Sequence, residues 1–192
     1  THSGEEFLAK IKPTSEKSGA AMRASPLGVL SDITTILERS RVQAATTHNT
    51  PLGIASAQAA ALMSHYFLYR LGEKRHLGAW LEEYVAGEWG TEYTGVVKSK
   101  GWMSVRAAIT AIRHSDSLAE LLQECVNFGG DVDTVATIAM GAAAGSEEIE
   151  KNLPPQLIEG LENGPFGRKY LTELDDLLQI LVTPVEPACQ DS

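Results

Sequence analysis

Residues 126–145 read Val-Asn-Phe-Gly-Gly-Asp-Val-Asp-Thr-Val-Ala-Thr-Ile-Ala-Met-Gly-Ala-Ala-Ala-Gly, and this stretch decides the fold. The pair Gly129-Gly130 predicts a turn, because glycine adopts backbone conformations that other residues avoid. From Thr134 onward, apolar residues recur at helical spacing, and many of them are alanine or glycine. The stretch therefore predicts a tight turn that enters a thin, closely packed helix.

Asp131, Asp133 and Thr134 place two carboxylates and a hydroxyl at the start of that helix. Hard oxygen donors of this kind suit Mg²⁺, Mn²⁺ or Ca²⁺ better than Zn²⁺ or copper. The simpler interpretation is helix capping, since Asp and Thr commonly accept from the free N–H groups of a first turn. One acid is enough for a cap, however, and a second acid adds repulsion unless a cation offsets it.

The composition indicates an all-α protein with a single compact domain. The chain has 192 residues, of which 43% are hydrophobic and only 6% aromatic, and alternating β-branched runs are scarce. At this length roughly 70% of the unfolded chain's surface is buried on folding. We expect the helical domain to cover residues 1–182 and a disordered, proline-containing tail to cover residues 183–192.

Charge and cysteine content restrict the partners and the compartment. The net charge of −9 and the pI near 5.0 argue against nucleic acid and anionic membranes as partners. No apolar run approaches the ~20 residues of a membrane span, and the first residues carry no signal-peptide pattern. Cys125 and Cys189 lack metal-ligand spacing, so we expect free thiols and a cytoplasmic protein.

Helix signals are clearest between residues 49 and 72. Asn49 or Thr50 can cap a helix, Pro51 suits its first position, and Gly72 can end it. His48 stands just ahead of this helix, where N–H groups and the helix dipole attract anions. Further helices are expected over 104–112, over 118–126 with Ser117 as cap, over 157–161 and over 171–182, while apolar spacing continues from 27 to 37.

The segment Phe128–Gly145 resembles the second metal-binding motif of the ADP-ribosylglycohydrolase family, which includes the dinitrogenase-reductase-activating glycohydrolases. That motif runs Gly-Gly-Asp-x-Asp-Thr into a helix rich in alanine and glycine. The resemblance implies an all-α orthogonal helical domain. It also implies that Asp131, Asp133 and Thr134 bind metal and that Gly129 and Gly130 contact the substrate.

Two earlier segments carry the same resemblance. Residues 19–28 are similar to the family's Asn-Gly-Ala-x-Met-Arg segment, whose loop and first turn contact ADP-ribose, and residues 47–59 are similar to its Thr-His segment, which lines the ligand cleft. The residues implied to bind substrate are, in chain order, Thr14, Ser15, Ser18, Gly19, Met22 and His48. Ser18 occupies the position of the family's asparagine and offers one hydroxyl in place of an amide's donor and acceptor.

The chain departs from the family because the N-terminal Thr-Asp-Asp motif and an early Gly-Asp-Ala-type segment do not occur in it. The adjacent acids Asp175-Asp176 lie on the polar face of a helix and do not match that motif. The resemblance thus covers about residues 14–160 and corresponds to the family's C-terminal part only. Three explanations stay open: a fragment whose other half is separate, a shortened member that recruits ligands differently, or a member that binds ADP-ribose without catalysis.

The leading hypothesis is a hydrolase that releases ADP-ribose from a modified protein or a related glycoside. The resemblance implies Mg²⁺ or Mn²⁺, with two ions if a complementary N-terminal segment or a second subunit supplies the missing ligands. No single residue is assigned as the catalytic acid or base. One alternative is a non-catalytic protein that binds ADP-ribose or a nucleotide. Another is a helical scaffold in which Asp131 is only a cap, so that Asp131→Ala costs about 1 kcal/mol and leaves ligand affinity unchanged.

Overall fold

The computed structural model describes residues 3–180, and this part of the chain is helical without a β-strand. The predicted all-α class is therefore confirmed. The elements are α1 (Gly4–Lys10), α2 (Gly19–Met22), η1 (Ser25–Val29), α3 (Ile33–Ala45), α4 (Pro51–Leu68), η2 (Lys74–His76), α5 (Leu77–Glu82), α6 (Gly101–His114), α7 (Leu118–Asn127), α8 (Val132–Ala143), α9 (Pro155–Glu159) and α10 (Arg168–Gln179), where η denotes a short 3₁₀ helix.

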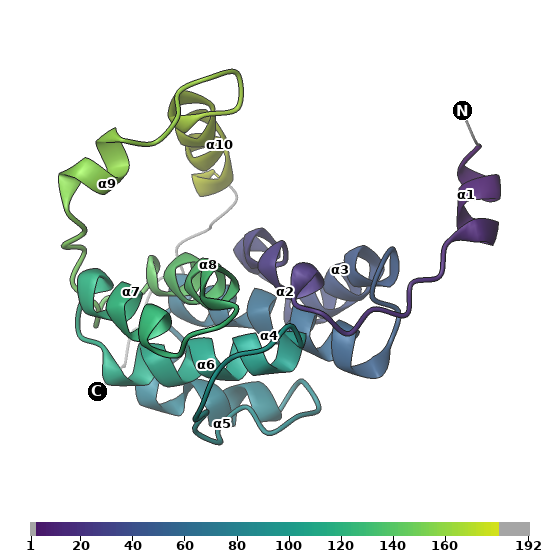
Figure 1. Cartoon of the computed structure of the whole chain (residues 1–192), viewed down its shortest axis with the longest axis horizontal. Coiled ribbons are helices and arrows are strands. Elements are labelled where there is room, and N and C mark those ends of the chain that lie inside the picture. The colour runs from purple at the N-terminus through teal and green to yellow at the C-terminus, as the bar shows by residue number, and fades with distance from the viewer. Residues whose placement is uncertain (1–2, 181–192) are drawn as a thin grey trace, which may run out of the picture.

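The helix α4 runs through the centre of the bundle and packs against α2, η1, α3, α5, α6 and α8 (Figure 1). It is apolar on nearly all sides, as expected of a helix surrounded by protein. Its alanines at 57 and 59–61 are fully buried, so the neighbouring backbones can approach closely. Gly28 of η1 is one such contact, because a Cβ there would lie 2.7 Å from the Ala61 carbonyl oxygen.

The helices α6, α7 and α8 pack against one another and complete the core beside α4. Leu121 of α7 and Ile138 and Ala139 of α8 are fully buried between them. Cys125 of α7 is also fully buried as a free thiol, and its burial raises the thiol pKa to about 12. The helix that delivers the Gly129-Gly130 turn is thus fixed by apolar packing.

Two helix starts follow the sequence prediction, and one helix end does not. Thr50 caps α4 by accepting from the Gly53 N–H at 3.1 Å, with Pro51 in the first position, and Ser117 caps α7. The prediction that Gly72 ends α4 is wrong, because the helix stops at Leu68 and Arg70 takes the left-handed φ of +52°. A Cβ at residue 72 would lie 2.3 Å from the Tyr66 hydroxyl, so the glycine there leaves room for that side chain.

Other boundaries shift by a few residues. The helix expected over 104–112 extends over Gly101–His114, and the apolar spacing over 27–37 is divided between η1 and α3, with Asp32 capping α3. The helix expected over 171–182 begins earlier, as α10 at Arg168. The proposed tail at 183–192 lies outside the described residues.

Three helices stand apart from the bundle (Figure 1). Among residues 3–180, neither α1 nor α9 nor α10 makes an extended contact with another helix. A membrane span is also missing from this part of the chain, since none of its helices combines the necessary length and apolar character.

Candidate functional site

The turn between α7 and α8 has the geometry that its two glycines predict. Gly129 and Gly130 have φ values of +67° and +79°. Residue Val97 pairs with this turn, since its N–H donates to the Gly129 carbonyl at 3.2 Å and its carbonyl accepts from the Asp131 N–H at 3.0 Å. A Cβ at position 130 would lie 2.0 Å from the Val97 carbonyl oxygen, so only glycine fits.

The Asp131 carboxylate is held by two hydroxyl groups. The Ser18 hydroxyl donates to its Oδ2 at 3.0 Å, and the Thr134 hydroxyl donates to its Oδ1 at 2.9 Å. Asp131 occupies the N-cap position of α8, yet its side chain makes no capping hydrogen bond. The interpretation of Asp131 as an ordinary helix cap is therefore wrong.

The helix α2 supplies the other side of this cluster. Ser18 precedes α2 and is buried, and its hydroxyl lies 3.4 Å from the Thr134 hydroxyl. The Met22 sulfur lies 3.3 Å from the same Thr134 oxygen. Ser18 and Met22 from one predicted segment and Asp131 from another thus meet at Thr134, which is itself buried.

Asp133 lies in the first turn of α8 and is exposed. Its carboxylate is the second hard donor in this stretch of the sequence, beside those of Asp131 and Thr134 in chain order. Within residues 3–180, no group of three or more His, Cys, Asp or Glu side chains is arranged to hold a metal ion. The predicted metal residues are therefore neighbours that offer two carboxylates and one hydroxyl.

His48 is buried at the start of α4, beside the strand-like segment that contains Thr14. The two residues form an isolated antiparallel bridge, and His48 Nδ1 lies 2.6 Å from the Thr47 hydroxyl. Burial lowers the His48 pKa, and the nearby Arg23 guanidinium lowers it further. Gly19 faces this ring, since a Cβ there would lie 3.5 Å from His48 Cε1. The structure thus places a neutral imidazole next to α2.

Arg23 is a site residue that the sequence analysis did not single out. Its guanidinium donates to the Thr47 hydroxyl at 2.7 Å, to Gln43 Oε1 at 2.7 Å and to the Gly19 carbonyl at 3.1 Å. These bonds fix an exposed positive charge near the N-terminus of α4, where an anion is favoured. The signal in the sequence was its place in the Met-Arg part of the segment 19–28.

Thr14 and Ser15 lie in a segment that is fixed mainly through its backbone. The Pro13 carbonyl accepts from the Asn49 N–H at 2.6 Å, and the Ser15 carbonyl accepts from the Thr50 hydroxyl at 3.3 Å. The Ser15 hydroxyl accepts from the Lys17 N–H at 3.2 Å, whereas the Thr14 side chain is exposed. This segment therefore leads to the cluster that contains Ser18, and the Thr14 side chain is its solvent-exposed part.

The predicted residues form two clusters joined by α2. One consists of Ser18, Met22, Asp131 and Thr134, and the other of Gly19, His48 and Thr14 with Arg23. Ser18 and Gly19 are consecutive, so the acidic cluster and the basic cluster are adjacent. Such an arrangement can bind a cation at one end of a ligand and a phosphate at the other.

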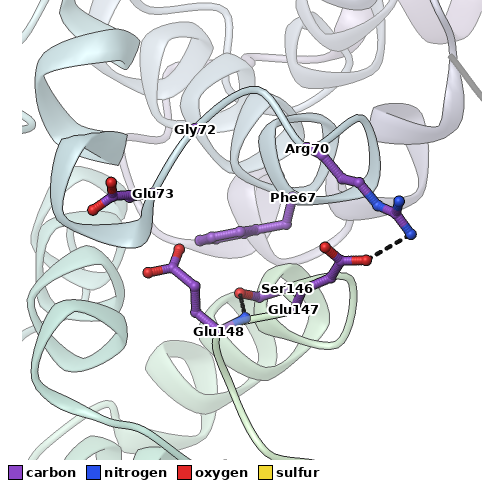
Figure 2. Close-up of a pocket in the computed structure, with 7 residues that line it drawn as sticks. All are labelled: Phe67, Arg70, Gly72, Glu73, Ser146, Glu147 and Glu148. Atoms are coloured by element: carbon purple, nitrogen blue, oxygen red, sulfur yellow. Dashed lines mark hydrogen bonds and ion pairs between the residues drawn. The ribbon is translucent and has the colours of Figure 1, made fainter. Parts of the chain in front are cut away.

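A cavity of about 220 Å³ lies elsewhere in the molecule (Figure 2). It is lined by residues that follow or end α4 and by the loop after α8: Phe67, Arg70, Gly72, Glu73, Ser146, Glu147 and Glu148. Arg70 and Glu147 form an ion pair at 2.6 Å on its rim. His48 and Asp131 lie at the opposite ends of the same two helices, and α4 alone is about 27 Å long. This cavity is therefore separate from the clusters around α2.

Comparison with known proteins agrees with the motifs. The family model described as ADP-ribosylglycohydrolase matches residues 2–187. This range is essentially the whole chain, so the expectation that the likeness covers only residues 14–160, as a C-terminal part, was too narrow. A comparison of this chain with curated proteins found no match. Because the family model spans nearly every residue and the motif residues meet in space, this chain belongs to the ADP-ribosylglycohydrolase family.

Proposed function

We propose that the protein releases ADP-ribose from a modified protein or a related N- or O-glycoside with the help of a divalent metal ion. Family membership supports a glycohydrolase-type function. The observation that carries the finer proposal is the bonding of the Asp131 carboxylate, which makes no capping bond to the N–H groups of α8 and instead accepts from the Ser18 and Thr134 hydroxyls. A carboxylate needed only for capping would accept from the backbone N–H groups in the first turn of α8.

The donors on α8 suit one Mg²⁺ or Mn²⁺ ion. Mg²⁺ is commonly held by one or two carboxylates, with water and substrate oxygens in the remaining positions. Asp131, Asp133 and Thr134 fit that description for a single ion, while residues 3–180 offer too few further acids nearby for a second. The bound ion would polarise a water and orient the ribose diol. A segment that carries further carboxylates, on this chain or a second one, would complete a binuclear centre.

The remaining residues would bind and orient the ADP-ribose. Arg23 and the first turn of α4 offer positive charge to the pyrophosphate, and the neutral His48 adds a hydrogen bond without adding charge. Gly129 leaves space for the sugar, since a Cβ at this position would meet nothing within 4 Å. The Ser18 and Thr134 hydroxyls keep the Asp131 carboxylate in place. The bound ADP-ribose would thus extend from Asp131 across α2 to His48.

Calorimetric titration with ADP-ribose, with and without Mg²⁺, tests this proposal. We expect Mg²⁺-dependent binding that Asp131→Asn weakens at least tenfold, because the amide removes the negative charge but keeps the side-chain shape. Glu38→Gln, the same change at an exposed position of α3, is the control and should bind like the wild type. Equal binding by the wild type and Asp131→Asn would contradict a metal site at α8.

A non-catalytic ADP-ribose-binding protein is the second candidate. The small number of acidic side chains near Asp131 favours it. Turnover of a mono-ADP-ribosylated protein separates the two candidates, since both predict binding and only the enzyme releases free ADP-ribose. If release occurs only after a carboxylate-bearing partner segment is added, the site is completed from outside residues 3–180. We also propose a cytoplasmic location, on the basis of the free buried thiol.

A further inference from the structure

The end of the described chain carries an unusual concentration of exposed apolar side chains. Within residues 3–180, nine of the sixteen exposed large hydrophobic residues fall between 157 and 180. They are Leu157, Ile158, Leu161, Phe166, Tyr170, Leu171, Leu174, Leu177 and Ile180. A concentration of exposed apolar side chains of this kind marks a candidate interaction site.

The helix α10 arranges four of these side chains, together with the half-buried Leu178, on one face. At 100° per residue, Tyr170, Leu171, Leu174, Leu177 and Leu178 fall on one side of the helix, and Lys169 and Asp176 fall on the opposite side. The helix has only 12 residues and no extended contact with another helix of residues 3–180. Since so short a helix is marginal in water, its apolar face needs a partner.

Two charged residues on the border of this face indicate which partner. Arg168 and Asp175 are two helical turns apart and lie along the same border of the apolar face. The rise between them is about 10.5 Å, which is too long for an ion pair within one helix. When two identical helices pack antiparallel, equivalent borders face each other and run in opposite directions. Arg168 of one copy then meets Asp175 of the other, and two-fold symmetry forms this pair twice.

We propose that α10 is a self-association surface that pairs antiparallel with α10 of a second copy of this chain. Leu171 and Leu174 form the apolar centre of the contact, and two symmetric Arg168–Asp175 pairs set its direction. The proposal does not depend on the reaction at Asp131, because it concerns a helix apart from the bundle that holds the site (Figure 1).

Sedimentation velocity over a range of protein concentrations tests the pairing. We expect the mass to rise from the 20.6 kDa of one chain to twice that value. Leu174→Asp should stay monomeric, because it places a carboxylate in the centre of the apolar face. The variant should keep its fold, since Leu174 is exposed and α10 makes no extended contact with another helix of residues 3–180. A wild type that stays monomeric at every concentration would overturn the proposal, as would a Leu174→Asp variant that still dimerises.

A charge exchange tests the antiparallel direction. Arg168→Asp alone and Asp175→Arg alone each set like charges against each other in the homodimer, so each should self-associate at least tenfold more weakly. A mixture of the two variants restores both pairs and should form a heterodimer. Lys169→Asp and Asp176→Arg make the same charge changes on the opposite face and serve as matched controls without effect. Single variants that dimerise like the wild type, or a mixture that gains nothing, would exclude this arrangement.

Discussion

The hydroxyl group of Ser18 shows how a site residue can act through its neighbour. It is buried and donates to Asp131 at 3.0 Å, so its removal leaves one carboxylate oxygen without a donor. We expect Ser18→Ala to weaken ADP-ribose binding severalfold and to lower the free energy of unfolding by about 1 kcal/mol. Calorimetry and denaturant unfolding measure the two effects.

Ser146→Ala is the control for that experiment. Its hydroxyl accepts from the Glu148 N–H, two residues away in the loop after α8, at 3.2 Å. We expect binding to stay within twofold of the wild type. If both variants lose affinity equally, the effect belongs to a general loss of stability and not to the Ser18–Asp131 hydrogen bond.

At the scale of single residues, the sequence identified most residues of the site but not the directions in which their side chains point. Asp131, Thr134 and Ser18 were identified from local motifs, and they meet in space. The sequence could not show that Asp131 turns away from the α8 N–H groups, because Asp at an N-cap position is compatible with both arrangements. Arg23 was missed as a ligand-binding candidate, because its partners Gln43 and Thr47 lie 20 and 24 residues away in the chain.

At the scale of the helices, the turn between α7 and α8 gives a matched pair of substitutions. Both glycines have a positive φ, but only a Cβ at Gly130 meets an atom, the Val97 carbonyl oxygen at 2.0 Å, while a Cβ at Gly129 meets nothing within 4 Å. We expect Gly129→Ala to cost about 1 kcal/mol from backbone strain alone. Gly130→Ala should cost roughly 2 kcal/mol more, since the Val97 pairing must also break.

Thermal and denaturant unfolding of the two variants measure this difference. Because Asp131 follows the turn directly, Gly130→Ala should also weaken Mg²⁺-dependent binding, whereas Gly129→Ala should weaken it less. Equal loss of stability in both variants would mean that the Val97 contact contributes little to holding the turn.

Some helix boundaries can be predicted from nearby residues in the sequence, and others depend on residues far away in the chain. The start of α4 was predictable, because Thr50 and Pro51 are local cap residues. The start of α6 was not, because Gly101 is held by the carbonyl of Glu16, a residue far away in the sequence, at 2.9 Å. The end of α4 was also missed, since Gly72 is explained by the space that the Tyr66 hydroxyl needs.

At the scale of the whole molecule, two buried histidines predict the pH dependence of stability. Burial lowers the pKa of His65, and burial together with the Arg23 charge lowers the pKa of His48. The unfolded chain therefore binds protons below about pH 6.5 that the folded protein does not bind. The contribution of these two histidines to the free energy of unfolding is complete above that pH. It is lost as the pH falls from about 6.5 toward the folded-state pKa values.

Unfolding by denaturant at a series of pH values measures this slope, which amounts to at most about 1.4 kcal/mol per pH unit for each histidine. His65→Gln should flatten the slope, because glutamine does not titrate and can still donate to the Gly28 carbonyl that lies 3.3 Å from His65 Nδ1. An unchanged slope in His65→Gln would assign the pH dependence to other groups.

The fold class could be predicted for the whole molecule, but its assembly could not. A composition rich in alanine and leucine indicates helices, and the small residues of α4 and α8 predict close packing. The sequence predicted a helix over 171–182, and the apolar face of the observed α10 lies outside the bundle. Sequence periodicity shows that a face is apolar, and only three-dimensional packing shows what covers it.

The rate at which the buried Cys125 reacts with thiol reagents can report on the motion of α7. The thiolate is the nucleophile that attacks thiol reagents, and a pKa of about 12 leaves almost none of it at neutral pH while α7 is in place. In a chain with Cys189 replaced by serine, the labelling rate would report how often α7 leaves the core. Because α7 ends at the turn before Asp131, ligands that tighten this turn would slow the labelling, and binding could be followed without any assay of turnover.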